Sequence, residues 1–346
     1  MKRSVNVNPS NKFDRHYTSR EHEEGIDLEP DQYEQSTNYL EIFPKTVVNK
    51  VSSPDVGMDY SLNPYQGCEH GCAYCYARNS HQYWGYSAGL DFEQNILVKK
   101  NTAQILERTI NAKSWEVKPI SLSGNTDCYQ PIERKLKLTR SALEVLARHK
   151  HPAGIITKNA LVTRDKDILR EMAEDRLVRV VFSINTLNED LRRKMEPRTS
   201  SVRKKLQALQ ELSEVGIPCG VMMAPIIPGL NSHEIFNLAE TTANAGSLSL
   251  GYTIVRLNEN LSEIFSAWIR EAFPDRADKV LNQIKTIHGG KLNDSRFGKR
   301  MKGEGKFAEM VKGTMDIARN RFFSGREFEP LNTSAFIGNR QMNLFQ

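Results

Sequence analysis

Short apolar segments alternate with segments of helical periodicity along most of the 346-residue chain, and this alternation limits the possible folds more than any other feature. Amphipathic helices are expected over 102–110 and 138–149, where apolar residues recur every three or four positions. Parallel strands need a crossover between them, so strands that alternate with helices predict a parallel α/β sheet. The predicted strands are 59–64, 118–123, 153–157, 178–185, 217–224 and 249–256.

Six strand–helix units are fewer than the eight that close a full barrel. We therefore expect an open, partial (βα)6 TIM-like barrel with an N-terminal arm and a helical C-terminal extension. In folds of this kind the functional side chains lie at the carboxyl ends of the strands. The residues that follow each predicted strand are therefore the first candidates for a site.

The two ends of the chain differ in composition from its centre. The first 50 residues are polar and include an acidic stretch, so they predict an extended arm. The expected divisions are a polar N-terminal extension over 1–50, the barrel over 51–260, a helical basic region over 261–335 and a flexible tail over 336–346.

The basic charge of the chain is concentrated near its C-terminus. Between residues 291 and 326, ten Lys and Arg stand against four Asp and Glu, a difference of +6 that equals the net charge of the whole chain. Such a segment can contact nucleic-acid phosphates, or it can be the solvated face of a helix. No stretch approaches the roughly 18 apolar residues that span a bilayer. The opening MKRSVNVNPSNKF lacks the apolar core of a secretory signal, so we expect a cytoplasmic protein without membrane insertion.

Three of the five cysteines, Cys68, Cys72 and Cys75, fall within eight residues and directly follow the first predicted strand. An odd number of cysteines without an export signal argues against a disulfide framework. Thiolates are soft ligands that suit iron–sulfur clusters. A C-x3-C-x2-C loop supplies three ligands for a [4Fe–4S] cluster and leaves the fourth iron open. The alternative is a zinc site that combines the same cysteines with His70 or His81.

The loop CEHGCAYC, with Tyr74 as the aromatic residue before the last cysteine, resembles the signature of the radical SAM superfamily. The segments NPYQGCEHGCAYCYAR, SGNTDCYQPIERKLKLTR, TKN with a following RD, and EPRTSS with APIIPGLN resemble its photolyase-related group, which includes spore photoproduct lyase. They cover residues 58–232, and the full pattern resembles a bacterial subfamily of unassigned substrate. The resemblance implies a [4Fe–4S] cluster and S-adenosylmethionine, cleaved to a 5′-deoxyadenosyl radical, and an electron donor of the flavodoxin or ferredoxin type.

The resemblance also implies contacts with S-adenosylmethionine at the ends of the second and third strands. Thr126 and Asp127 match the pair that contacts the amino group in related enzymes. Lys158, after the strand AGIIT, matches a lysine that pairs with the methionyl carboxylate.

Further contacts are implied at the later strands. Ser183 and Asn185 end the fourth strand, where they would meet the ribose hydroxyls. Arg198, in EPRT, would anchor a carboxylate or the substrate, and Ile227, after the fifth strand, would contact the adenine.

Spore photoproduct lyase splits a thymine dimer in DNA with a cysteine that returns hydrogen and tyrosines beside the cluster loop. Gly124 stands at the position that matches this cysteine. Two residues are therefore candidates for a hydrogen relay. Tyr76 matches a flanking tyrosine, and Cys128 lies four residues after Gly124.

Three functions are compatible with the sequence. The first is a radical lyase acting on damaged DNA, favoured by the family resemblance and by the basic C-terminal segment. The second is a radical SAM enzyme acting on a small molecule, a peptide or RNA. The third is a non-catalytic iron–sulfur protein that binds nucleic acid, which would have no S-adenosylmethionine pocket.

The chain ends in Gln341-Met-Asn-Leu344-Phe345, which resembles the Gln-x-x-Leu-Phe peptides by which bacterial repair and replication proteins bind the sliding clamp. A flexible end that places two apolar anchors in a pocket accounts for binding of this kind. The sequence therefore predicts the sliding clamp as a partner.

We expect a fluorescent peptide of residues 336–346 to bind the purified clamp in an anisotropy titration. Leu344→Ala should abolish the signal, because it removes one of the two apolar anchors. The absence of wild-type binding up to high micromolar peptide would rule this partner out.

Overall fold

The computed structural model describes residues 3–13 and 36–338. All six predicted strands form, and they lie in one sheet in chain order with parallel neighbours. A short strand, β2 (Val48–Lys50), pairs antiparallel with the first of them and forms one edge. The six strands are β3 (Tyr60–Leu62), β6 (Ile120–Leu122), β7 (Ala153–Thr157), β8 (Val178–Ser183), β9 (Cys219–Ile226) and β10 (Leu250–Ile254). This confirms the partial (βα)6 barrel.

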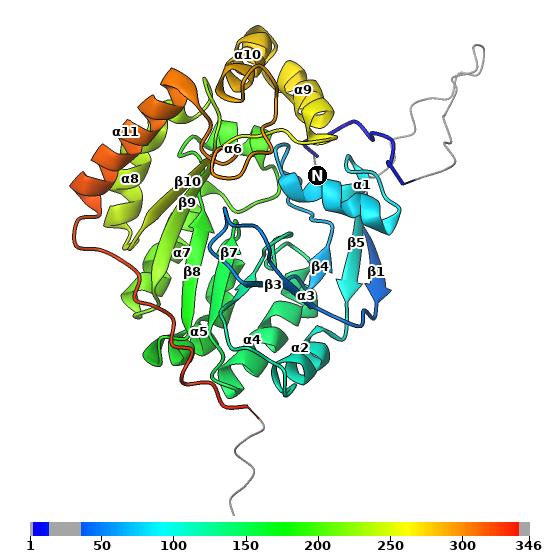
Figure 1. Ribbon diagram of the computed structural model, residues 1–346, viewed down its shortest axis with the longest axis vertical. Coiled ribbons are helices and arrows are strands. Elements are labelled where there is room, and N and C mark those ends of the chain that lie inside the picture. Colours follow the sequence, from blue (N-terminus) through cyan, green and yellow to red (C-terminus); the bar gives the residue numbers. More distant parts are fainter. Residues whose placement is uncertain (1–2, 14–35, 339–346) are drawn as a thin grey trace, which may run out of the picture.

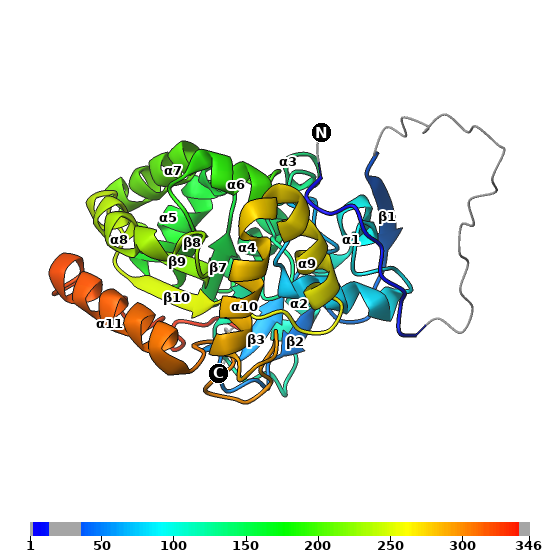
Figure 2. The ribbon, with the colours of Figure 1, turned by 90° about the horizontal axis from the view of Figure 1, so that it is seen from above.

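Helices cover the outer face of this curved sheet, as Figures 1 and 2 show. The helix expected over 102–110 is observed over those residues, and the one expected over 138–149 ends one residue earlier. The covering helices are α2 (Thr102–Ile110), α4 (Leu138–Arg148), α5 (Lys166–Glu174), α7 (Val202–Glu214) and α8 (Ile235–Asn244). Shorter helical segments lie in the loops: η1 (Tyr76–Trp84), α1 (Asp91–Gln94), α3 (Glu133–Leu136), η2 (Ala160–Asp165), α6 (Glu189–Met195), η3 (Ser232–Glu234) and η4 (Pro274–Arg276).

The two faces of the strands differ in chemistry, and β8 illustrates the difference. Val178, Val180 and Phe182 are buried in the core between the sheet and the helices. Successive side chains of a strand point to opposite faces, so Arg179 and Ser183 face the inside of the barrel. Packing against the outer helices therefore supplies the main core.

The N-terminal region is more structured than a polar arm. Residues 38–42 form β1 (Asn38–Ile42), which pairs in parallel with β5 (Asn95–Lys99) in a second sheet that also contains β4 (Tyr65–Gln66). Val5 is buried in the same apolar cluster as Cys72. The β1–β5 pairing joins residues 57 positions apart, such as Asn38 and Asn95, and local sequence patterns do not reveal such distant partners.

The C-terminal region is helical, as expected. Helices α9 (Leu261–Ala272) and α10 (Ala277–Ile287) pack above the carboxyl ends of the strands, and α11 (Gly305–Phe322) lies against α8 (Figure 1). The chain then crosses the opposite end of the barrel, where Ile337 hydrogen-bonds with His149. The Gln341–Phe345 motif lies outside the described residues. No helix of the described ranges is long and apolar enough to cross a bilayer.

A buried histidine gives the fold a defined acid sensitivity. His151 accepts a hydrogen bond from Trp115 Nε1 at 3.1 Å, and burial lowers its pKa to about 4. The ordinary pKa of histidine is about 6.5. Between about pH 4 and pH 6.5 the unfolded chain therefore binds a proton at this residue that the folded chain does not, and the free energy of unfolding falls as the pH falls.

At pH 5 we expect this residue alone to cost about 2 kcal/mol of unfolding free energy relative to pH 7. Urea denaturation at both pH values should show a smaller difference for His151→Gln than for wild type. His233→Gln, at an exposed position, is the control and should retain the wild-type difference. Equal pH differences in all three proteins would contradict the assignment.

Candidate active site

A cavity of about 1240 Å³ lies inside the barrel. At the carboxyl ends of the strands, Cys68, Cys72 and Cys75 all line it, and at the opposite end it reaches Arg179 near the start of β8. Small residues such as Ser121 form much of its wall. Its volume exceeds the roughly 300–1,000 Å³ typical of drug-sized ligand pockets, so it has room for a cofactor and part of a substrate.

The cysteine loop is held in shape by a fully buried arginine. Arg78 donates through Nε to the carbonyl of Cys72 at 2.9 Å and forms an ion pair with Glu93, which is also fully buried. Gly71 has a φ of +66°, and a Cβ at this position would lie 2.6 Å from the Glu93 carboxylate. The close approach of this carboxylate therefore explains why the loop needs glycine there.

The three cysteines of the loop do not form a ready-made site for a single metal ion. All three are free thiols, and burial is the main cause that raises the pKa of Cys72 and Cys75. Within the part of the chain that the structure describes, no three His, Cys, Asp or Glu side chains are placed to hold one metal ion. Zinc needs ligands that converge on one point, whereas each thiolate of a [4Fe–4S] cluster binds a different iron. The loop could therefore hold such a cluster.

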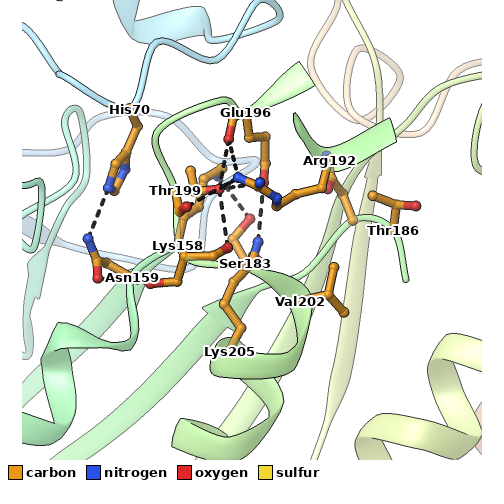
Figure 3. Close-up of polar contacts among 12 residues, drawn as sticks. His70, Lys158, Asn159, Ser183, Thr186, Arg192, Glu196, Thr199, Val202 and Lys205 are labelled. Carbon is orange, nitrogen blue, oxygen red and sulfur yellow. Dashed lines mark hydrogen bonds and ion pairs between the residues drawn. The ribbon is translucent and has the colours of Figure 1, made fainter. Parts of the chain in front are cut away.

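Lys158 lies beside the cysteines, at the end of β7. Its Nζ donates to Ser183 Oγ at 2.9 Å (Figure 3). The same Nζ lies 5.9 Å from the centroid of the Tyr74 ring. Burial lowers the pKa of Lys158, but Glu196 and Cys72 outweigh it and the net shift is upward. A permanently charged ammonium at this place can bind a carboxylate.

Asp127 is an anchor for the neighbouring loops. It accepts hydrogen bonds from Thr157 Oγ1 at 2.8 Å and from the backbone N–H of Lys158 at 2.7 Å, and it lies 3.4 Å from His70. Burial raises the pKa of Asp127, but His70 and the hydrogen bonds lower it by a larger amount. The net pKa is about 2. Thr126 lines the same wall of the cavity but donates its hydroxyl to a backbone carbonyl. Their contact with S-adenosylmethionine stays a prediction.

Beneath Lys158 lies a buried ion pair that the sequence did not reveal. Glu196 and Lys205 are 3.2 Å apart and fully buried. Glu196 also accepts a hydrogen bond from the hydroxyl of Tyr74, and Lys205 donates to the carbonyl of Ser183 at 3.3 Å. A pair of this kind contributes little net stability, because removing both charges from water is costly. Its consequence here is positional, since it fixes Tyr74 behind the cysteine loop and orients the end of β8.

Four candidate residues do not line the cavity. Cys128 is fully buried in the main core, which corrects the expectation that it reaches the site. Asn185 donates to the Tyr74 hydroxyl at 3.1 Å, and Arg198 pairs with Glu69 at 3.1 Å, outside the cavity. Ile227 lies in the apolar cluster under α9, and Ala224 and Pro225 line the cavity instead.

Tyr76, in contrast, lies at the cavity wall. Its side chain is half-exposed, and its hydroxyl donates to the carbonyl of Gly124 at 2.8 Å. This is the position that matches the cysteine of spore photoproduct lyase. The phenol therefore lies beside the place where a hydrogen donor was expected.

The cavity is basic, which the strand pattern alone did not predict. Seven Lys and Arg line it, against four Asp and Glu. A charged residue at an inward-facing position of a predicted strand, such as Arg179 within VRVVFS, could have indicated the basic cavity. The cations are Lys158, Arg179, Arg256, Arg300, Lys302, Arg319 and Arg326, and the acids are Asp55, Asp59, Asp127 and Glu327.

Two loops meet at the cavity mouth. Asp55 accepts from the backbone N–H of Gly298 at 2.7 Å and pairs with Arg300. Arg256 follows β10 and makes no hydrogen bond or ion pair with the described residues. Burial and the neighbouring Arg300 lower the pKa of Arg256. The nearby Asp55 and Tyr76 act against this lowering.

Comparison with known proteins agrees with this geometry. The family model described as "Radical SAM superfamily" matches residues 62–242. The chain belongs to the radical SAM superfamily. This family uses a [4Fe–4S] cluster and S-adenosylmethionine, so the chain is a radical SAM enzyme.

Similar proteins include both uncharacterized and named ones. An uncharacterized protein of Mycobacterium tuberculosis is 30% identical, over 68% of this chain and 71% of its own length. One of Methanocaldococcus jannaschii is 29% identical, over 70% of this chain and 87% of its own length. A radical SAM Nα-GlyT isomerase of Pseudomonas phage M6 is 27% identical, over 53% and 37% respectively.

Among solved structures, spore photoproduct lyase complexed with a dinucleoside spore photoproduct is similar in fold. Its TM-score is 0.62 at 20% identity, covering 83% of this chain and 80% of that one. At this level of identity the likeness concerns the fold.

The assignment of the cluster ligands can be tested by metal loading. After anaerobic reconstitution we expect about four irons per wild-type chain and a large loss in Cys72→Ala, because one ligand is missing. Cys219→Ala, at a buried core position away from the cavity, should load as wild type does. Iron analysis and visible absorbance are the measurements, and equal loading of the two variants would contradict the assignment.

Proposed function

We propose that this radical SAM enzyme acts on nucleic acid, with damaged DNA as the substrate of a lyase reaction. The observation that carries the proposal is the basic cavity, in which seven cations outnumber four acids. Phosphates attract such a surface regardless of base sequence. A cavity inside the barrel also suits a base that leaves its stack to reach a reactive centre.

When bound, the reduced cluster and S-adenosylmethionine supply a 5′-deoxyadenosyl radical for hydrogen abstraction. We assign Cys68, Cys72 and Cys75 as the cluster ligands. Lys158 would bind the carboxylate of S-adenosylmethionine, and Ser183, which accepts its hydrogen bond, would orient it. The buried wall beneath them excludes water from the reacting groups.

Tyr76 is our candidate for the residue that returns a hydrogen atom to the product radical. Its O–H bond breaks as the new C–H bond forms, and an electron from the proposed flavodoxin- or ferredoxin-type donor, with a proton, restores the phenol. Its hydroxyl contacts the carbonyl of Gly124, and the ring lies at the cavity wall close to Cys75. Cys128 has no place in this proposal, because it lies in the core.

A second candidate is a rearrangement in place of a cleavage. The phage relative is named as an isomerase and the structural neighbour as a lyase. Similarity therefore supports radical chemistry in general and does not choose between isomerisation and cleavage. A small molecule, a peptide or RNA stays an alternative substrate. A flavodoxin- or ferredoxin-type donor and the sliding clamp are the proposed protein partners.

The test is the formation of 5′-deoxyadenosine by the reconstituted, dithionite-reduced protein, measured by mass spectrometry. We expect ultraviolet-irradiated DNA to stimulate it several-fold over intact DNA, with Cys72→Ala as the blank. Slow cleavage that ignores irradiated DNA would leave the cofactor chemistry in place and remove the nucleic-acid proposal.

The same assay contains the test of Tyr76. Tyr76→Phe should still form 5′-deoxyadenosine. It should accumulate less repaired product per molecule of 5′-deoxyadenosine, because the phenolic hydrogen is gone. Tyr83→Phe, at an exposed position outside the cavity, is the control. A wild-type product ratio in Tyr76→Phe would eliminate the relay.

A further inference from the structure

The end of the cavity opposite the cysteines contains an arginine without a hydrogen-bond or ion-pair partner among the described residues. Arg179 lines the cavity and makes no hydrogen bond or ion pair with the described residues. Its guanidinium lies over the ring of Phe328, whose centroid is 5.6 Å from the guanidinium carbon. This contact covers a face of the guanidinium and leaves its N–H edge free for a ligand.

Next to Arg179, the neighbouring strand provides space. Gly154 pairs with Arg179 in the β7–β8 register. A Cβ at Gly154 would lie 3.9 Å both from Arg179 Nε and from the hydroxyl of Ser121 on β6. The absence of a side chain at Gly154 therefore leaves a recess, with a guanidinium on one side and a hydroxyl on the other.

Several charged groups in the rest of the cavity are already engaged. Asp127 is hydrogen-bonded by Thr157 and the backbone of Lys158, and Asp55 pairs with Arg300. No acid that lines the cavity pairs with Arg179 in the described part of the chain. A half-buried cation without a counter-charge is costly unless a ligand supplies one.

We propose that Arg179, with Ser121 and the recess at Gly154, forms a phosphate-binding subsite for the substrate. The guanidinium matches phosphate geometry with two parallel N–H donors, and the hydroxyl adds a third. The proposal rests on the proposed function, since it names which part of a nucleic acid enters this end of the cavity.

The position of the subsite determines which phosphate it takes. Arg179 precedes Ser183 by four residues of β8, so their Cα atoms lie about 13 Å apart at about 3.3 Å per residue. That distance is longer than the 3.4 Å between successive nucleotides of a stacked strand. The phosphate therefore belongs to a neighbouring nucleotide and not to the one that reacts beside Ser183.

The experiment uses reconstituted full-length protein and single-stranded thymidine tetranucleotides at one fixed ionic strength. In each probe a different phosphodiester is replaced by an uncharged methylphosphonate, and affinity is measured by fluorescence anisotropy. We expect wild type to lose about tenfold in affinity at one linkage, the size of one charge-assisted hydrogen-bond pair. Arg179→Gln should bind the unmodified probe about tenfold more weakly and be insensitive to that linkage.

Two further variants separate the subsite from general charge and folding effects. Arg203→Gln removes the same charge at an exposed position of α7, outside the cavity, and should bind as wild type does. Gly154→Val keeps Arg179 but fills the recess, and its Cβ meets only ordinary contacts at 3.9 Å. It should therefore fold and still lose the linkage-specific affinity.

The outcomes distinguish this subsite from the proposed function. Equal tetranucleotide binding by wild type and Arg179→Gln, or an unchanged linkage effect in the variant, would overturn the subsite and leave the nucleic-acid proposal standing. Binding of thymidine 5′-monophosphate that depends on Arg179, without tetranucleotide binding, would support the subsite and reject nucleic acid in favour of a small phosphorylated substrate. No binding of either probe would overturn both.

Discussion

The structure depends on a sheet whose inner face is not filled by its own side chains. In closed eight-stranded barrels, layers of large apolar residues pack the interior. Here the inward positions include Ser121, Gly154 and Ser183, and the interior is a cavity of about 1240 Å³. Burial on the outer face must therefore stabilise the fold, and the helices packed on residues such as Val180 and Phe182 supply it.

This arrangement leaves the carboxyl ends of the strands to be organised by polar contacts. The cysteine loop packs into apolar clusters, and buried charges also hold it, with Arg78 and Glu93 on one side and Glu196 and Lys205 beneath. Helices α9 and α10 then cover this end with a second apolar cluster. A loop that must present three thiolates in a fixed arrangement gains from supports that tolerate little movement.

Local patterns predicted the parts of the molecule that depend on neighbours in sequence. The six strands and the helices over 102–110 and 138–149 follow from periodicity, and the cysteine loop follows from ligand spacing. Partners far apart in sequence were missed: β1 joins β5, and Glu196 meets Tyr74 more than a hundred residues away. Cys128 was misjudged for a related reason. Proximity in sequence to Gly124 suggested the cavity, whereas its side chain points into the core.

Charge pairing changes along the cavity, and the change separates two kinds of binding. Near the cysteines the charged groups have protein partners: Lys158 binds Ser183, and Asp127 accepts several hydrogen bonds. These groups are already oriented, which favours a cofactor that must bind in one geometry. Arg179, at the opposite end, has no hydrogen-bond or ion-pair partner among the described residues, so its charge is paired only when an anion arrives. In a cavity arranged in this way, the polar groups at one end are already oriented to bind the cofactor. At the other end, the negative charge of the substrate supplies the missing partner of the arginine.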